Sequence, residues 1–320
     1  MTRISRRAFG KINLGLRVLG KRDDGYHEIS TVMAAVGIHD ILHFEPLTEG
    51  IIVTCPGLPG LPQDKNLVAR AARLLLGEAK GQGLSVTVEK NIPPGAGMGG
   101  GSSDAAVTLL TLNEMLPPEE RKDMASLLQT ASKIGADVPF FIGCNSTPPT
   151  WEVALCTGIG EAVNPLPVHF SRGVREPHEA NRSSEKDPYD IWVVLAFPQF
   201  EVSTVLAYRD WDVGAVRGAG EEDEAALLSA LEAGDKVELG RNLHNDLEGP
   251  VSRRYPSILR IKEEFIRQGV LGASMTGSGS AVFAVCGSGE EAAGIKVRMD
   301  RMKRELGLRA TVVTRVGCWS

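Results

Sequence analysis

The sequence has few of the features that mark secreted and membrane proteins. Its 320 residues include only five cysteines, which are odd in number, scattered and without Cys-x-x-Cys spacing. We therefore expect neither a disulfide framework nor a zinc site, and the expected compartment is a reducing cytoplasm. No run approaches the ~18 consecutive apolar residues of a membrane-spanning helix. The N-terminal MTRISRR is basic but no apolar segment follows it, so we expect no secretory signal.

A large excess of charge of one sign is also missing. The chain carries 35 Lys and Arg against 40 Asp and Glu, mixed along its length, for a net charge of −5. This balance argues against nucleic acid or a membrane surface as the main partner and favours a small molecule. The hydrophobic fraction of 42% is ample for a sizeable core. The length suggests two domains or one large domain, and nothing in the sequence indicates an oligomeric state.

Glycine, in contrast, is concentrated at residues 93–103, which read PPGAGMGGGSS and include five glycines. Glycine loses more backbone entropy on folding than any other residue, so stability alone does not favour such a loop. The alternating segment Leu84–Lys90 before it predicts a strand, and Ser102–Leu116 after it predicts a helix. Free N–H groups and the positive end of the helix dipole then face one point, which predicts an anion-binding site.

Several kinds of loop compete for this string. GAGMGG fits the dinucleotide pattern G-x-G-x-x-G, but a second helical stretch, Glu119–Lys133, follows where that fold needs a parallel strand. A Walker loop needs Gly-Lys-Ser/Thr, and here Gly101 is followed directly by Ser102. A flexible linker does not fit between a strand and an apolar helix. The whole string resembles the ATP loop of the GHMP kinases, the superfamily of galactokinase, homoserine kinase and mevalonate kinase.

The order of the predicted elements favours an α+β fold, because strands gather first and helices follow. Further strands are predicted at Ile4–Gly20, Ile29–Val36, Ile41–Phe44, Ile51–Thr54, Trp151–Cys156, Ile191–Phe197, Ala281–Cys286 and Ala310–Val316. Further helices are predicted at Leu67–Ala79, Ser203–Asp210, Glu221–Ala233, Pro250–Gln268 and Glu290–Leu306.

The polar stretch His169–Asp190 has few apolar residues and predicts a loop or insertion near a domain boundary. We therefore expect an N-terminal ATP-binding domain at residues 1–165, a polar loop at 166–190 and a C-terminal domain at 191–320. The polar stretch and the segment 143–150 are both longer than the resembled family leads us to expect, and their roles stay open.

Four further segments resemble one branch of the GHMP kinases, and their order is the expected one. They are GKINLGL at 10–16, DDGYHE at 23–28, GADVPFF at 135–141 and MTGSG at 275–279, with NDLEGPV at 245–251 in addition. Members of this branch use ATP and Mg²⁺ to phosphorylate the 2-hydroxyl of 4-diphosphocytidyl-2-C-methyl-D-erythritol in non-mevalonate isoprenoid synthesis. The resemblance implies a two-domain GHMP kinase fold, with an S5-like N-terminal domain, a ferredoxin-like C-terminal domain and the active site between them. One departure is that Phe9 and Gly10 stand where the family usually has proline and alanine.

Lys11 and Asp137 are the candidate catalytic residues. Asp137 lies among apolar neighbours, where a carboxylate is costly to bury unless it is paired, and Lys11 in an apolar strand is a natural partner. Phosphoryl transfer needs positioning, charge neutralisation and a group that takes or orients the hydroxyl proton. The resemblance implies that Asp137 is this base and that Lys11 holds it ionised. The alternative is a structural ion pair that ties the first strand to a later helix.

The glycine loop supplies the expected ATP-binding residues, which are Pro93, Pro94, Gly95, Ala96, Gly97, Met98, Gly99, Gly100, Gly101, Ser102 and Ser103. The two serines can cap the helix or bind phosphate and magnesium, and Ser103 is a candidate Mg²⁺ ligand. A second glycine turn, implied by the resemblance to lie near the same phosphates, contains Gly277, Ser278 and Gly279. Its alternative is an ordinary tight turn into the following strand.

The resemblance implies that Tyr26 and His27 hold the cytosine and that Asn13 contacts the substrate. An aromatic ring stacked on a base contributes about 1–3 kcal/mol. The alternative is that Gly25, Tyr26 and His27 form only a turn with a capping aromatic side chain.

Two rival functions remain. One is another small-molecule kinase of the superfamily, such as a homoserine or mevalonate kinase, which DDGYHE and GADVPFF argue against. The other is a non-catalytic nucleotide-binding regulator on the same fold, which the presence of both Lys11 and Asp137 argues against.

Overall fold

The computed structural model describes residues 3–58, 60–77, 83–168, 190–214 and 220–317. Most of the polar stretch, residues 169–189, lies outside the described residues, so our expectation for it stays a prediction. Within the described residues, no helix is long and apolar enough to cross a membrane.

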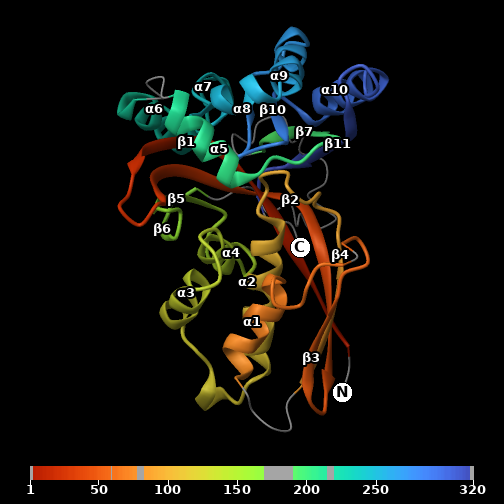
Figure 1. Cartoon of the computed structure of the whole chain (residues 1–320). Helices are drawn as coiled ribbons and strands as arrows, with labels where there is room; N and C mark the ends of the chain where they lie inside the picture. The colour runs from red at the N-terminus through yellow and green to blue at the C-terminus, as the bar shows by residue number, and fades with distance from the viewer. Residues whose placement is uncertain (1–2, 59, 78–82, 169–189, 215–219, 318–320) are drawn as a thin grey trace, which may run out of the picture.

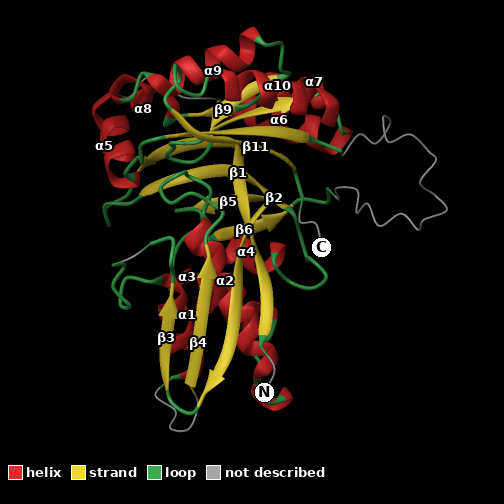
Figure 2. Cartoon of the chain, turned by 90° about the vertical axis from the view of Figure 1, so that its right-hand side faces the viewer, coloured by secondary structure: helices red, strands yellow, loops and turns green. Residues whose placement is uncertain are grey.

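Two long antiparallel strands form the centre of the N-terminal sheet (Figure 2). They are β1 (Ile4–Lys21) and β2 (His27–Leu47). One end of β2 pairs with β4 (Gly83–Glu89) and the other with β5 (Val153–Gly158). Shorter strands complete the sheet: β3 (Gly50–Thr54), β6 (Ala162–Pro165) and β8 (His244–Asn245), which runs parallel to β1.

Our division of β2 into two strands, Ile29–Val36 and Ile41–Phe44, is wrong. The strand continues through residues 37–40, where the pairing with β1 shifts register between Phe9 and Gly10. Such an irregularity bends a strand without ending it, and a sequence pattern then shows it as a break.

Helices pack against one face of this sheet, as Figure 1 shows. They are α1 (Leu67–Leu76), α2 (Gly100–Met115), the 3₁₀ turn η1 (Pro118–Glu120), α3 (Met124–Ser132) and α4 (Val138–Cys144). The single helix expected at Glu119–Lys133 is wrong in its first part, because the chain is extended at Arg121 and α3 begins only after Asp123. The Asp123 carboxylate accepts the backbone N–H of Ser126 and so caps α3.

The C-terminal half forms a second, four-stranded antiparallel sheet with helices on its outer face (Figure 1). Its strands, in spatial order, are β11 (Leu308–Arg315), β7 (Trp192–Pro198), β10 (Val282–Cys286) and β9 (Gly272–Met275). Its helices are α5 (Thr204–Gly214), α6 (Glu221–Ala233), α7 (Lys236–Arg241), α8 (Glu248–Arg254), α9 (Ser257–Arg267) and α10 (Gly289–Arg301).

The one helix expected at Pro250–Gln268 is in fact two, α8 and α9. Pro256 lacks a backbone N–H and disfavours the helical conformation of the residue before it, so the chain turns at Tyr255.

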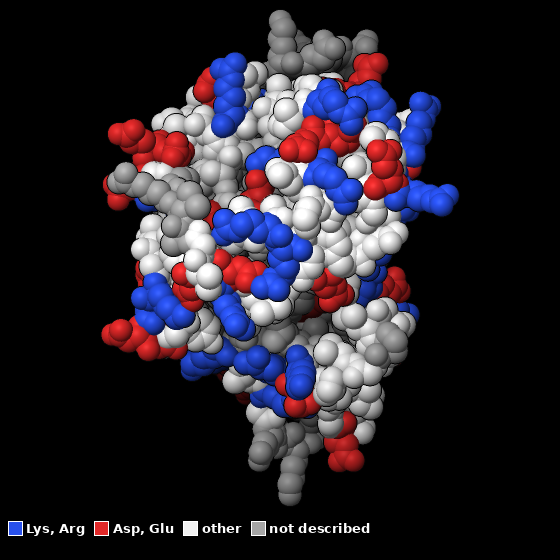
Figure 3. Space-filling view, turned by 45° about the horizontal axis from the view of Figure 1, so that its top comes forward, with Lys and Arg blue, Asp and Glu red and all other residues white. Residues whose placement is uncertain are grey.

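The two sheets share a continuous apolar core. Ile12, Leu14 and Val32 of the N-terminal sheet pack in one cluster with Leu195 and Phe283 of the C-terminal sheet. This core holds the loops between the sheets in fixed positions, and the expected α+β fold is confirmed. On the face in Figure 3, basic and acidic side chains are intermingled, in keeping with the small net charge.

Candidate active site

A cavity of about 1010 Å³ lies between the two halves of the chain. The sequence-predicted residues Lys11, Asn13, Tyr26, His27 and Asp137 all line it, although they come from β1, the β1–β2 turn, the start of β2 and the α3–α4 loop. The loop residues from Pro93 to Ser102 and the turn Gly277–Gly279 line it too. The fold therefore brings all the sequence-predicted site residues except Ser103 to one cavity.

The two glycine loops meet backbone to backbone. Ser280 N–H donates to the carbonyl of Gly95 at 3.1 Å, and Ala281 N–H donates to that of Ala96 at 3.3 Å. At Gly97 a Cβ would lie 2.1 Å from the carbonyl oxygen of Thr276, a distance no side chain tolerates. Glycine at position 97 is thus required by the contact between the two halves as well as by its φ of 74°.

Gly99 begins the N-terminus of α2 that faces the cavity. It adopts a left-handed conformation (φ 67°, ψ 20°) immediately before the helix. A Cβ there would lie 2.7 Å from the ring of Phe141 and 3.3 Å from Oδ2 of Asp137. The loop, the helix start and Asp137 are therefore packed together, so an anion bound at this helix N-terminus would lie near the carboxylate.

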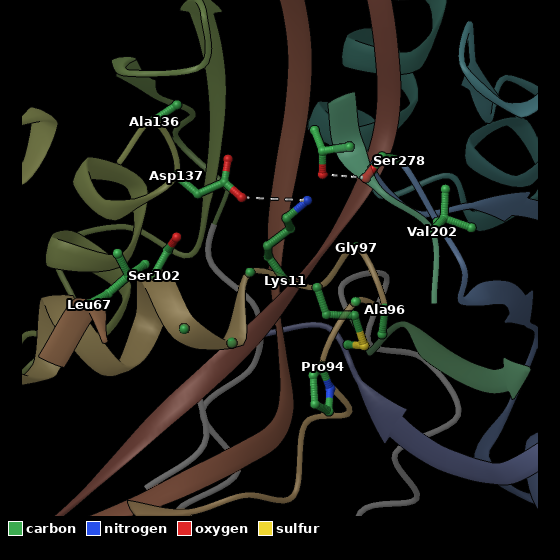
Figure 4. A pocket seen from close by; sticks show the side chains of 18 of the residues that line it. Lys11, Leu67, Pro94, Ala96, Gly97, Ser102, Ala136, Asp137, Val202 and Ser278 are labelled. Carbon is green, nitrogen blue, oxygen red and sulfur yellow. Dashed lines mark hydrogen bonds and ion pairs between the residues drawn. The ribbon is translucent and has the colours of Figure 1, made fainter. Parts of the chain in front are cut away.

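Lys11 and Asp137 point toward each other across the cavity, as Figure 4 shows. Lys11 Nζ lies 4.0 Å from Asp137 Oδ2 and donates to Asn13 Oδ1 at 2.5 Å. Burial lowers the pKa of Lys11, and the nearby carboxylate of Asp137 opposes that shift. The Lys11 side chain is 4% exposed and that of Asp137 is 30% exposed, so the carboxylate is the member that a substrate can reach.

Asn13 and Thr276 lock the strand β1 to the second glycine turn. The Asn13 backbone N–H donates to Thr276 Oγ1 at 3.1 Å, and Asn13 Nδ2 donates to Thr31 Oγ1 at 2.8 Å. The Asn245 side chain donates to the carbonyls of Met275 and Gly277 at 2.7 and 2.8 Å. Asn13 thus orients Lys11, and the turn is held on both sides.

The two loop serines differ in position. Ser102 lines the cavity, whereas Ser103 is fully buried and its Oγ accepts a hydrogen bond from Asn145 Nδ2 at 3.1 Å. Because that hydroxyl is buried away from the cavity lining, Ser102 is the serine placed to meet a phosphate or a cation.

One end of the cavity is aromatic. His27 stacks on Tyr208 with ring centroids 4.7 Å apart, and its Nε2 lies 2.8 Å from Asp212 Oδ1. Hydrogen bonds from Lys21 and then His27 lower the pKa of Asp212. Tyr26 lines the same end but is 60% exposed, so its ring is free to receive a planar group. Tyr208 and Asp212, both on α5, were not identified in the sequence.

The end of the cavity beside the first turn of α2 was also missed. Apolar side chains and three charged ones line it together: Cys55, Leu58, Leu61, Lys65, Asn66, Leu67, Val88, Lys90 and Asp104. The cavity thus has two ends, with the glycine loops and the Lys11–Asp137 pair between them. No sequence signal marks this end, since its residues come from a loop, a helix and a strand.

The chain is similar to known proteins over nearly its whole length. Residues 66–144 match the family model described as GHMP kinases N terminal domain, and residues 227–304 match GHMP kinases C terminal. The chain is 36% identical over 313 residues to the 4-diphosphocytidyl-2-C-methyl-D-erythritol kinase of Moorella thermoacetica, covering 96% of this chain and 97% of the relative. It is 36% identical to the kinase of the same name from Caldicellulosiruptor bescii, covering 95% and 97%.

Solved structures are similar over the whole chain. A crystal structure of 4-(cytidine 5'-diphospho)-2C-methyl-D-erythritol kinase superposes with a TM-score of 0.71 at 32% identity and covers 98% of this chain and 99% of its own. A homoserine kinase from Cytophaga hutchinsonii superposes with a TM-score of 0.70 at 19% identity, covering 100% and 96%. At that identity the second similarity shows the fold alone.

Proposed function

The chain belongs to the 4-diphosphocytidyl-2-C-methyl-D-erythritol kinase family of the GHMP kinases, and we propose that it transfers the γ-phosphoryl group of ATP to the 2-hydroxyl of that cytidylylated acceptor, in the synthesis of isoprenoid precursors. One observation carries the proposal. The Lys11–Asp137 pair, the glycine loops and the aromatic residues Tyr26 and His27 all line a single cavity.

In the proposed reaction, the acceptor oxygen attacks the γ-phosphorus while the bond from that phosphorus to the bridging oxygen of ADP breaks. The hydroxyl proton passes to the Asp137 carboxylate, which is exposed enough to reach it. Lys11 keeps its positive charge close to Asp137 and to the transferring group, where negative charge is greatest. Backbone N–H groups of the loop and the start of α2 bind the remaining phosphates.

Mg²⁺ is the proposed metal cofactor. Among the described residues, no group of three or more His, Cys, Asp or Glu side chains is placed to hold a metal. Mg²⁺ is commonly bound through one or two carboxylates together with substrate phosphates, so it would enter with the nucleotide. Ser102 lines the cavity beside the loop and fits this role better than the buried Ser103. The metal would neutralise charge on the phosphates.

The two ends of the cavity suit the two bases of the reactants. We assign the aromatic end to the cytosine, with Tyr26 as the stacking ring and His27 as a hydrogen-bonding group held by Asp212. The end beside α2, where Leu58, Leu61 and Leu67 offer apolar contacts, then takes the adenosine of ATP. We also propose that residues 1–165 form an N-terminal ATP-binding domain and residues 191–320 a C-terminal domain, and that the enzyme is cytoplasmic.

An assay of ADP release against a panel of acceptors tests the function. We expect turnover with 4-diphosphocytidyl-2-C-methyl-D-erythritol and only background rates with homoserine, mevalonate or no acceptor. Robust turnover with homoserine or mevalonate, and none with the cytidylylated acceptor, would contradict the proposal. ATP binding without turnover of any acceptor would instead favour the non-catalytic rival.

A further inference from the structure

Asp212, in the last turn of α5, joins the two halves of the chain beside the aromatic end of the cavity. Its Oδ1 lies 2.8 Å from His27 Nε2, and its Oδ2 accepts a hydrogen bond from Lys21 Nζ at 2.6 Å. All three residues line the cavity. One carboxylate thus contacts both the end of β1 and the start of β2, at the place proposed for the cytosine.

The ring of His27 is held in one orientation by three residues of α5. Tyr208 stacks on it with ring centroids 4.7 Å apart, and the ring of Trp211 meets it edge-on at 5.7 Å. Together with Asp212 these residues are spaced i, i+3 and i+4, so they lie on one face of the helix. The His27 side chain is only 7% exposed. Its ring therefore presents a fixed edge to the cavity.

The Asp212 carboxylate decides which nitrogen of His27 carries the proton. Hydrogen bonds from Lys21 and then from His27 lower the pKa of Asp212, so the carboxylate is ionised and can only accept. Nε2 therefore carries a hydrogen, and in the neutral ring Nδ1 keeps its lone pair. Within the described parts of the chain, no group forms a hydrogen bond with Nδ1. A ligand in the cavity is thus offered an acceptor at this nitrogen.

We propose that Asp212 is a positioning residue that fixes the tautomer of His27 and thereby makes the site select a cytosine base over a uracil base. The inference rests on the proposed function, because it takes this end of the cavity as the cytosine site. Cytosine presents its 4-amino group, a donor, where uracil presents a carbonyl acceptor. The lone pair of Nδ1 accepts from the amino group and repels the carbonyl oxygen. The other tautomer, with a hydrogen on Nδ1, would favour uracil.

Kinetics with two acceptors test the inference, using the cytidylylated acceptor and its uridylyl analogue. Asp212→Asn keeps the shape of the side chain, but its amide can donate to Nε2 as well as accept from it, so both tautomers become accessible. We expect KM for the cytidylylated acceptor to rise about tenfold, the effect of one hydrogen bond of ordinary strength. The preference for cytosine, as the ratio of the two kcat/KM values, should fall by a similar factor. Neither kcat nor KM for ATP should change.

Asp210→Asn is the matched control. Asp210 lies on the same helix and forms an ion pair with Arg254, but it does not line the cavity. We therefore expect the wild-type preference for cytosine in this variant. A rise in acceptor KM in Asp212→Asn with the preference for cytosine unchanged would overturn the proposal, because it would show that Asp212 only fastens α5 to the β1–β2 turn.

Nitrogen-15 NMR tests the tautomer itself without any acceptor. His27→Gln identifies the His27 resonances by their loss. At about pH 8, above the usual titration range of histidine, we expect a protonated Nε2 and an unprotonated Nδ1 in the wild-type protein, and a mixture of tautomers in Asp212→Asn.

A wild-type His27 with its hydrogen on Nδ1 would overturn the proposal, and this spectrum decides even if Asp212→Asn does not fold. Failure of the proposed function would appear differently, since the wild-type protein would then phosphorylate neither the cytidylylated acceptor nor its uridylyl analogue. That result would overturn the selection of cytosine as well.

Discussion

At the scale of single residues, the site depends on one carboxylate that remains accessible beside a buried ammonium group. Lys11 is held by Asn13 and enclosed by the second glycine turn, since a Cβ at Gly277 would lie 3.2 Å from Lys11 Nζ. Asp137 is 30% exposed and lines the cavity. This asymmetry favours Asp137 as the proton acceptor and Lys11 as a fixed positive charge.

Asp137→Asn keeps the shape of the side chain but removes the charge and the proton acceptor. We expect kcat to fall by at least ~10²-fold, the lower end for general-base catalysis, and kcat/KM to fall with it. Steady-state kinetics measure this, with Glu263→Gln on an exposed position of α9 as the matched control. Near-normal kcat in a folded Asp137→Asn protein would show that Lys11 and Asp137 form a structural ion pair and not a catalytic one.

Tyr26→Ala separates base recognition from chemistry. Loss of a stacking ring worth about 1–3 kcal/mol should raise KM for the cytidylylated acceptor by about 5- to 150-fold and leave KM for ATP unchanged. Tyr26→Phe retains the ring and should restore the acceptor KM. A fall in kcat with an intact acceptor KM would show that Tyr26 has another role.

Asp104 makes folding stability depend on pH. Burial raises its pKa in the folded protein to about 7, above the ordinary value of 3.8, so the folded state binds the extra proton. The stabilising contribution of this proton to the free energy of unfolding is complete below pH 4 and is lost as pH rises toward 7. Urea unfolding at pH 5 and pH 8 should show a larger loss of unfolding free energy in the wild type than in Asp104→Asn, and equal losses would contradict this.

Sequence could supply those site residues that lie within short motifs, and the structure places all of them except Ser103 on the cavity lining. Their assigned roles stay predictions. The sequence alone could not identify Tyr208 and Asp212 as site residues, because their positions beside His27 depend on how α5 packs across the cavity. The buried contacts of Lys90 with Asp40 and Asp104 were missed for the same reason, since the three residues are adjacent only in the folded chain.

At the scale of elements, the two glycine loops form one structure. Hydrogen bonds from Ser280 and Ala281 to Gly95 and Ala96 join them, and glycine permits their backbones to touch. The loops are therefore one unit that both halves of the chain must build.

Gly99→Val should abolish ATP binding. A β-branched side chain resists the φ of 67° and would overlap the ring of Phe141. Gly249→Ala on α8 is the matched control, because its Cβ would meet nothing within 4 Å and Gly249 does not line the cavity. ATP titration of both folded proteins measures this, and unchanged affinity in Gly99→Val would show that the loop does not bind phosphate.

Element boundaries show where sequence patterns fail. The strand–loop–helix arrangement around the glycine loop was predicted almost to the residue, since alternation and helical periodicity were both clear. The helix at 250–268 was predicted too long because its apolar periodicity hides the break at Pro256. Helix α4 was missed because its seven residues are all buried and show no polar face.

At the scale of the whole molecule, the shared core fixes one half against the other. The cluster that joins Ile12 and Leu14 to Leu195 and Phe283 runs beneath the cavity. The α+β fold and the family could be predicted because five motifs in order span the chain. The packing of the two halves could not, since it depends on contacts between distant segments.

The central claim is that the γ-phosphoryl group of ATP ends on the 2-hydroxyl of the cytidylylated acceptor. Phosphorus NMR of the reaction mixture tests it most directly, because it resolves the diphosphate of the acceptor from a new phosphate monoester. We predict one monoester resonance, formed in step with ADP and without resolved proton coupling, because the carbon that bears the 2-hydroxyl carries a methyl group and no hydrogen. Inorganic phosphate alone, or a monoester at another position, would contradict the account.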